Sequence, residues 1–367
     1  MLAEIKELKP LASNFQNGMS LSKSDFTFLQ ELGSGSFGKV YKVSSNFDNR
    51  IYAMKVLSKN QLTKLKLIPQ LINEISLLSR CSHKNIIELY TAFEDEKYIY
   101  LVMELANEGT LFHKLKGQKT FTENVVSSYM TDVVRAIIYL HSLSPPILHR
   151  DLKPENVLIS NNTLKIADFG WSNVDDDFRN TYCGTPDYLA PEMIRGTGHN
   201  EKLDVWTLGV LMYELLHGRP PFSPPKGTKT NKRELQKIIE KNILSGKVDF
   251  NDDISAAARD TIHALMNPAP SERPTAKEIF ELEFFKLHNK ANVSPIISRK
   301  ASFQNKTKSS QESIEKLKER IKTLEQDKIE LEKSLEAQMA KAYEYEKERE
   351  RMRGNENVAM MLQQIVS

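Results

Sequence analysis

The feature that most constrains the fold of this chain is a glycine-rich segment near its start. Residues 33–38 (GSGSFG) have the G-x-G-x-x-G spacing, in which glycines let backbone N–H groups approach a phosphate without a Cβ in the way. In dinucleotide-binding folds such a segment opens a helix, whereas here Val40, Tyr41 and Val43 continue as a strand pattern. We therefore expect the segment to join two antiparallel strands and to lie as a flap over phosphates.

A lysine interrupts the next strand pattern. Lys55 stands in residues 52–56 (YAMKV), a run that otherwise has the composition of a buried strand. An ammonium group in such a position costs free energy unless it has a partner. Glu74 is the candidate partner, because Leu71 and Leu78 place it in a segment of helical period. The alternative is a Glu74 that is exposed to solvent.

Three further motifs follow in order along the chain. They are HRDLKPEN at 149–156, after an apolar helical pattern that ends near His141, DFG at 168–170, after a short strand pattern, and APE at 190–192. With the glycine-rich segment and Lys55 they resemble the eukaryotic protein-kinase family, over about Asp25 to Lys290. The resemblance implies an α+β fold of two lobes, a small β-rich N-lobe and a larger helical C-lobe, with ATP and Mg²⁺ as cofactors.

The resemblance also implies a role for each residue of the site. Asp151 would accept the proton of the substrate hydroxyl, and Lys153 would neutralise the transferring phosphoryl group. Asn156 and Asp168 would supply oxygen ligands to Mg²⁺. The implied ATP-binding residues are Leu32, Gly33, Ser34, Gly35, Ser36, Phe37, Gly38, Lys39, Val40, Ala53, Lys55, Glu74, Met103, Glu104, Ala106, Leu158 and Asp168. Because no required residue is missing, we expect an active serine/threonine protein kinase rather than a scaffold that uses an inactive kinase fold.

The segment after Asp168 resembles one branch of that family, the Aurora serine/threonine kinases. Trp171 follows DFG, and Arg179 precedes Thr181 by two residues, as in the Aurora activation loop. The resemblance implies a phosphorylated Thr181, whose phosphate would order the loop through Arg150. It also implies roles in mitosis, at centrosomes, spindle or chromosomes, and an activator protein on the N-lobe helix that carries Glu74.

Two residues depart from the Aurora pattern and keep a second assignment open. Pro186 and Ala190 are more typical of basophilic kinases related to the cAMP-dependent enzyme, and they leave the residue preference after the phosphoacceptor open. That group usually carries a Phe-x-x-Phe tail, which this sequence lacks, so we favour Aurora. The connection 223–241 is longer and more basic than is usual in the Aurora family, and its role stays open.

Charge indicates the class of substrate. Glu155 and Glu214 match Aurora positions that receive an arginine two residues before the acceptor, which implies protein substrates with basic residues before Ser or Thr. Residues 299–303 (RKASF) have the same form, and we therefore hypothesise that Ser302 is autophosphorylated. The alternative is an unmodified serine.

The sequence after the kinase-like region changes character. Residues 291–311 are rich in Ser and Lys, as in a linker, and residues 312–353 contain neither Gly nor Pro and repeat apolar residues at heptad positions. A coiled coil with itself or with another chain is expected, and a single solvated helix is the alternative. The predicted order is an extension (1–25), a kinase domain (26–290, with lobes 26–106 and 107–290), a linker (291–311), a coiled coil (312–353) and a tail (354–367).

Composition limits the remaining possibilities. The 51 Lys and Arg residues against 48 Asp and Glu give a net charge of +3, too small to indicate nucleic-acid binding by bulk electrostatics. Two cysteines exclude a disulfide framework and fit a reducing cytosol or nucleus. No apolar run is as long as a membrane span, and the first residues do not resemble a signal peptide, so a soluble intracellular protein is expected.

We also predict that Arg273 pairs with Glu192.

Overall fold

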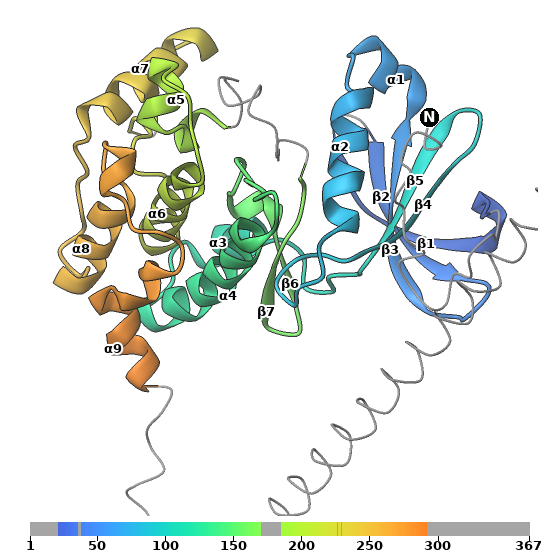
Figure 1. Ribbon diagram of the computed structural model, residues 1–367, viewed down its shortest axis with the longest axis horizontal. Coiled ribbons are helices and arrows are strands. Elements are labelled where there is room, and N and C mark those ends of the chain that lie inside the picture. The colour runs from blue at the N-terminus through green and yellow to red at the C-terminus, as the bar shows by residue number, and fades with distance from the viewer. Residues whose placement is uncertain (1–20, 36–37, 170–184, 226, 229, 292–367) are drawn as a thin grey trace, which may run out of the picture. The chain divides into compact units, whose positions relative to one another are not determined.

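The computed structural model describes residues 21–35, 38–169, 185–225, 227–228 and 230–291 (Figure 1). The predictions for Ser36, Phe37, Thr181, Ser302 and the coiled coil at 312–353 lie outside these ranges. The described part has the two-lobed α+β arrangement expected of a kinase fold. Among its helices, none is long and apolar enough to cross a membrane.

The N-lobe is built on a five-stranded sheet in which all neighbouring strands are antiparallel. In their order across the sheet the strands are β1 (Phe26–Gly35), β2 (Gly38–Ser45), β3 (Ile51–Ser58), β5 (Tyr98–Met103) and β4 (Leu89–Glu94). A short 3₁₀ turn, η2 (Lys23–Asp25), precedes β1, and the helices α1 (Lys59–Lys64) and α2 (Ile68–Ser79) follow β3. Helix α2 lies beside the sheet and contacts β4 (Figure 1).

The two faces of this sheet belong to different apolar clusters, because successive side chains of a strand point to opposite faces. In β5, Ile99 and Leu101 join the main core together with the apolar residues of α2, whereas Tyr100 and Val102 join a second cluster. In that second cluster the ring of Phe93 stacks on those of Phe26 and Tyr100, with centroids 5.7 and 4.7 Å away. The N-lobe sheet therefore has an inner face toward α2 and an aromatic outer face.

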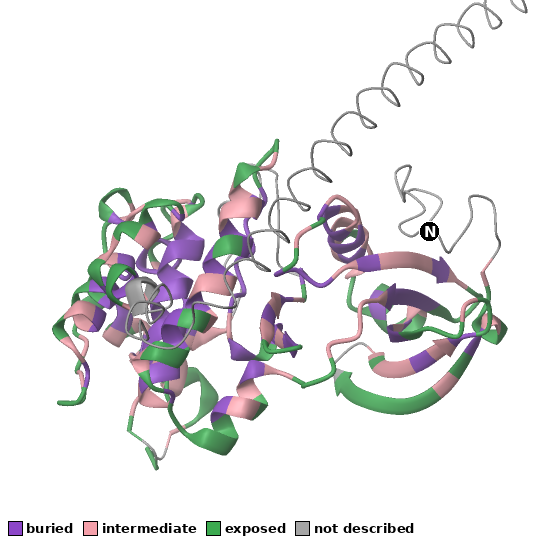
Figure 2. Ribbon diagram, turned by 90° about the horizontal axis from the view of Figure 1, so that it is seen from below, coloured by how far each residue is buried: buried purple, intermediate pink, exposed green. Residues whose placement is uncertain are grey.

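The C-lobe is mainly helical, and its buried residues gather at the centre of the lobe (Figure 2). Its helices are α3 (Leu111–Gln118), α4 (Glu123–Ser142), α5 (Pro191–Arg195), α6 (Lys202–His217), α7 (Lys232–Ser245), α8 (Ala256–Leu265) and α9 (Glu283–Ala291). A hairpin of β6 (Val157–Ser160) and β7 (Thr163–Ile166) lies against α4. The 3₁₀ turns are η3 (Pro154–Asn156), η5 (Pro186–Tyr188), η6 (Pro270–Glu272) and η7 (Glu278–Glu281).

Helix α6 is the centre of the C-lobe core. It packs against α4 and α8, and its residues 203–213 are all buried. Contact with α8 is close enough to require glycine at position 209, since a Cβ there would lie 2.5 Å from Cγ of Met266 and 2.9 Å from Cβ of Leu265. The helix therefore provides a fixed base for the segments that pack on its N-terminal end.

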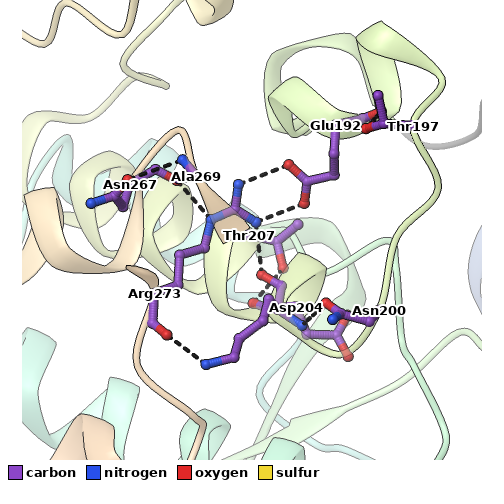
Figure 3. A network of polar contacts seen from close by, with 9 residues as sticks. Glu192, Thr197, Asn200, Asp204, Thr207, Asn267, Ala269 and Arg273 are labelled. Carbon is purple, nitrogen blue, oxygen red and sulfur yellow. Dashed lines mark hydrogen bonds and ion pairs between the residues drawn. The ribbon is translucent and has the colours of Figure 1, made fainter. Parts of the chain in front are cut away.

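A buried ion pair ties α5 to the segment that follows α8 (Figure 3). The guanidinium of Arg273, 2% exposed, donates through Nη1 and Nη2 to the two carboxylate oxygens of Glu192, at 2.7 and 2.8 Å. Its remaining donors reach the carbonyl oxygens of Asn267 and Lys202, and its plane lies 5.0 Å from the ring centroid of Trp206. The predicted pairing of Arg273 with Glu192 is confirmed.

Replacing one partner of this pair should destabilise the C-lobe strongly. In Arg273→Met the carboxylate of Glu192 is left buried without its counter-charge, so we expect the free energy of unfolding to fall by about 3–5 kcal/mol. Urea denaturation followed by tryptophan fluorescence measures this change. The double variant with Glu192→Gln should regain part of the loss, and Lys247→Met, at an exposed ion pair, should leave the unfolding midpoint unchanged. Equal midpoints for Arg273→Met and the unmodified protein would contradict the expectation.

Candidate active site

A cavity of about 530 Å³ is lined by residues of both lobes. The N-lobe contributes Val40 and Ala53 from the inner face of the sheet, and Leu158 of β6 closes the opposite side. The predicted residues that line the cavity are Leu32, Gly33, Val40, Ala53, Lys55, Glu74, Met103, Glu104, Ala106, Glu155, Asn156, Leu158 and Asp168. Ser34, Gly38 and Lys39 instead line a groove on the outer face of the sheet. Gly35 pairs with Gly38 at the tip of the β1–β2 hairpin.

The cavity also contains residues that the sequence motifs did not single out. Gln30, Lys42 and Ile87 line it from the N-lobe side, and Thr110 and Ala167 line it from the C-lobe side. Ala167 could have been found, because it directly precedes the Asp168 motif. The others could not, since each comes from a strand or loop whose contact with the cavity depends on the tertiary fold.

The glycine-rich segment is the turn between β1 and β2, as expected from its strand-like flanks. Gly38 stands where β2 passes closest to β3, and a Cβ on it would lie 2.0 Å from the carbonyl oxygen of Val56. No side chain fits at this position, which explains the glycine in packing terms alone. At Gly33, on the β1 side of the turn, an added Cβ would have no atom within 4 Å. Packing therefore does not require glycine at this position.

Lys55 and Glu74 form the charged pair that the sequence predicts. Lys55 Nζ donates to Glu74 Oε1 at 2.9 Å, joining β3 to α2, and Glu74 is buried. Burial alone would lower the pKa of Lys55, but the carboxylates of Glu74 and Asp168 outweigh it and raise that pKa. The ammonium group therefore stays charged and is held at the wall of the cavity, where it can bind an anion.

The segment after β5 connects the two lobes along the edge of the cavity. The N–H of Glu104 donates to the carbonyl of Glu88 at 2.9 Å, and the Glu104 carboxylate pairs with Lys165 of β7 at 2.9 Å. Met103 ends β5 directly before this connection. These contacts fix the backbone of the connection, which places the main-chain groups of Glu104 and Ala106 beside the cavity.

A second polar group surrounds Asp151, which is buried. Lys153 Nζ donates to both carboxylate oxygens of Asp151, at 2.8 and 3.1 Å, and to Thr185 Oγ1 at 2.8 Å. Asn156 Nδ2 donates to the backbone oxygen and to Oδ2 of Asp151, both at 2.8 Å. Thr185, which the family resemblance places near the catalytic Asp and Lys, therefore joins this group. Asp151 is held as an oriented hydrogen-bond acceptor.

The loop that carries Asp151 is fixed by a carboxylate from the core. Asp204, at the start of α6 and fully buried, accepts the backbone N–H groups of His149 and Arg150, at 3.0 and 2.9 Å, and Nε2 of His141 at 2.8 Å. Burial opposes the charge of Asp204, but these donors prevail and lower its pKa. Arg150 lies at a left-handed φ of 67°, a costly conformation for a non-glycine residue that the bonds to Asp204 hold in place.

The donor atoms near Asp168 fit a divalent cation. Asp168 has a left-handed φ of 63°, and the next residue, Phe169, is buried with its ring edge against His149 at 5.1 Å. Both Asp168 and Asn156 line the cavity. Because the amide nitrogen of Asn156 is engaged by Asp151, its Oδ1 is the atom left for a ligand. A carboxylate and an amide oxygen are the donors that hard cations such as Mg²⁺ prefer.

Three carboxylates, those of Glu155, Glu214 and Asp187, lie close enough to interact, and Glu155 lines the cavity. Tyr188 OH donates to Glu214, and Ser223 Oγ donates to Asp187. The pKa of Glu214 is raised to about 7, because burial and the charges of Glu155 and Asp187 together outweigh the hydrogen bond from Tyr188, which lowers it. Within the described residues none of the three carboxylates is in an ion pair. A cationic side chain would be attracted to this acidic group.

This fold and this arrangement of polar residues are those of a protein kinase. The family model described as protein kinase domain matches residues 26–285. Membership of this family implies the use of ATP and a divalent metal ion, and the donor set around Asp168 and Asn156 is suited to that use.

Curated relatives narrow the assignment. The chain is 37% identical to the Aurora kinase of Eremothecium gossypii, over 76% of this chain and 77% of that protein. It is 39% identical to the Schizosaccharomyces pombe Aurora kinase, over 69% of each chain. It is also 39% identical to the serine/threonine-protein kinase Aurora-1 of Arabidopsis thaliana, over 70% of this chain and 85% of the relative. The chain belongs to the Aurora kinases, and the assignment to kinases related to the cAMP-dependent enzyme is not favoured.

The pair between β3 and α2 can be tested without removing the lysine. Glu74→Gln leaves Lys55 without its carboxylate partner, so the ammonium is no longer held at the cavity wall, and we expect kcat to fall by about tenfold or more. Initial rates of phosphotransfer to a serine peptide measure it. Glu94→Gln is the matched control, since Glu94 pairs with Lys59 of α1 at 2.8 Å but lies outside the cavity lining. Equal losses in both variants would contradict a specific role for Glu74.

Proposed function

We propose that this kinase transfers the γ-phosphoryl group of ATP, with Mg²⁺, to Ser or Thr hydroxyls that follow basic residues in protein substrates. The observation that carries the proposal is the arrangement around Asp151. A buried carboxylate, held by Asn156 and Lys153, lies next to a cavity whose opposite wall carries the charged pair Lys55–Glu74. This arrangement supports a substrate that approaches a nucleotide from the Asp151 side.

Bound Mg-ATP supplies the reactive phosphoryl group. The residues of the chain position the two substrates and stabilise the negative charge that develops during the transfer. Asp151 accepts a hydrogen bond from the substrate hydroxyl and then its proton. Lys153 lies 2.8 Å from Asp151 Oδ2 and supplies positive charge where negative charge develops. Lys55 holds the phosphates, Asn156 and Asp168 hold the metal, and the apolar residues Val40, Ala53 and Leu158 enclose the adenine.

The acidic group of Glu155, Glu214 and Asp187 supports the preference for basic substrates. A partly buried carboxylate gains a counter-charge when an arginine binds, and the bidentate geometry of guanidinium favours arginine over lysine.

A peptide pair tests the reaction and the preference together. With Mg-ATP, a serine peptide with arginine two residues before the acceptor should have kcat/KM about tenfold above that of its alanine counterpart. Glu214→Gln should reduce this ratio, and Asp151→Asn should abolish turnover of both peptides. An active enzyme with a ratio near one would refute the basic preference alone, whereas no turnover of any peptide would refute the kinase reaction.

The same peptide pair gives a pH dependence with a defined sign. Because the pKa of Glu214 is raised to about 7, its side chain is largely neutral below that pH and anionic above it. The arginine-to-alanine ratio of kcat/KM should therefore rise between about pH 6 and pH 8. In Glu214→Gln the ratio should be flat over this range.

We also propose that this kinase acts in mitotic control. By analogy with Aurora kinases, it would work in cytoplasm and nucleus, at centrosomes, spindle or chromosomes. An activator protein on α2 and a coiled-coil partner for residues 312–353, either a second copy or another chain, would set its location. These proposals rest on the family assignment and on the heptad pattern of the sequence.

Two phosphorylation sites complete the proposal. Thr181 would be the activating site, with Arg150 as one receptor of its phosphate. Ser302, in the sequence RKASF, would be a site of autophosphorylation, because its two basic residues suit the acidic group at Glu155 and Glu214.

Mass spectrometry of phosphatase-treated protein, after incubation with Mg-ATP, tests both sites. We expect phosphate at Thr181 and Ser302 in the unmodified chain and at neither in Asp151→Asn. Thr181→Ala should lower peptide turnover by about tenfold. Arg299→Ala should reduce Ser302 occupancy, whereas Lys306→Ala, which also removes one nearby positive charge, should not. Full turnover by protein lacking phosphate at Thr181 would rule out the switch.

A further inference from the structure

The outer face of the N-lobe sheet carries a groove that the kinase reaction does not use. This groove, here named the outer-sheet groove, has a volume of about 580 Å³. Its aromatic and aliphatic lining is Phe28, Tyr41, Val56, Tyr98 and Tyr100. Ser34, Gly38, Lys39 and Gln61 lie among the residues at its border. Tyr98 is 40% exposed, a large apolar surface for a side chain on a β-sheet.

Strand register places the groove directly behind the catalytic lysine. Ser34, Lys39, Val56 and Tyr100 are cross-strand neighbours on β1, β2, β3 and β5, and all four line the groove. The next row across the same strands is Gly33, Val40, Lys55 and Leu101. Because alternate residues face opposite sides of a sheet, this second row faces the nucleotide cavity, which Gly33, Val40 and Lys55 line.

The N-terminus of the described chain starts on this same face. Leu21 packs against the aromatic outer cluster, together with Phe28 and Tyr41. Two residues later, Lys23 lines the groove, with its Nζ 5.3 Å from the ring centroid of Phe28. The chain therefore reaches β1 along the groove. The segment before Leu21 is joined to the described chain beside this groove.

Residues 1–20 are apolar enough to occupy the outer-sheet groove. Residues 1–20 contain the apolar side chains of Leu2, Ile5, Leu8, Leu11 and Phe15. Phe15 is six residues before Leu21, a span of up to about 20 Å. Tethering by so short a segment gives an effective concentration in the millimolar range, which favours this segment over an untethered protein.

We propose that residues 1–20 dock in the outer-sheet groove, with Phe15 against Tyr98 and Tyr41, and that docking tightens ATP binding. The expected effect on ATP binding follows from the two strands that flank the glycine-rich turn, β1 and β2. Ser34 and Gly38 stand at its two ends and line the groove, so an occupant there restrains the turn from the side opposite the nucleotide. A restrained turn loses less conformational freedom when ATP binds.

Thiol labelling in the full-length chain tests the docking. Gln61→Cys places a thiol at the groove, and Asn60→Cys places one on the preceding residue of α1, also exposed but outside the groove lining. Adding Leu11→Ser and Phe15→Ser should speed labelling of Gln61→Cys about fivefold and leave Asn60→Cys unchanged. Labelling is followed at each site by mass spectrometry of the modified peptide. Equal rates with and without the two serines would overturn the proposal, as would protection that disappears on dilution, which would indicate a second copy.

Kinetics test the consequence for ATP. In an otherwise unmodified chain, Phe15→Ser should raise KM for ATP about threefold with little change in kcat, whereas Phe47→Ser, at an exposed phenylalanine beyond the groove, should change neither. An unchanged KM in Phe15→Ser would overturn the effect on ATP binding even if the labelling shows docking. A chain inactive on every peptide would instead refute the proposed function, and the labelling result does not depend on that function.

Discussion

The buried carboxylate of Asp204 is the interaction on which the catalytic region depends. It stands on the most deeply buried helix of the C-lobe and accepts the backbone N–H groups of His149 and Arg150, so the start of the catalytic loop is fixed to the core. These bonds help to hold the left-handed conformation of Arg150. Asp151 follows directly, and its orientation is therefore set by packing that lies well beneath the active site. Glu192 and Arg273 hold α5 in the same way, through a buried bidentate pair inside the lobe.

Opposite charges are distributed between the two sides of the cavity. On the N-lobe side the ammonium of Lys55 is kept charged despite burial, because Glu74 and Asp168 surround it. On the C-lobe side Asp151 is compensated by Lys153, whereas Glu155, Glu214 and Asp187 form an acidic group. A phosphate-bearing ligand is attracted to the first side and a basic peptide to the second. The shape of the cavity and its electrostatics thus separate the two substrates of a kinase reaction.

Much of this site could be predicted from the sequence, because its residues occur in short motifs with fixed spacing. The turn between β1 and β2 and the pairing of Lys55 with Glu74 followed from strand and helix periods, and the pairing of Arg273 with Glu192 followed from the family resemblance. Ser34 and Lys39 were predicted from the same turn to bind ATP, yet they line the outer groove, because alternation along β1 and β2 turns them away from the cavity. The family resemblance also places Thr185 near the catalytic Asp and Lys, and its hydrogen bond from Lys153 agrees with this. Ile87 could not be selected from sequence, since its position depends on how distant segments pack. The proposed roles of Thr181, Ser302 and residues 312–353 concern parts of the chain outside the described ranges.

The contact between Gly38 and β3 has a mechanical consequence. A Cβ on Gly38 would collide with the carbonyl oxygen of Val56, so the hairpin backbone rests on the main chain of the residue that follows Lys55. Any side chain at position 38 would therefore push on β3 beside the lysine that lines the nucleotide cavity, so the fit of the glycine-rich turn and the position of Lys55 depend on one backbone contact.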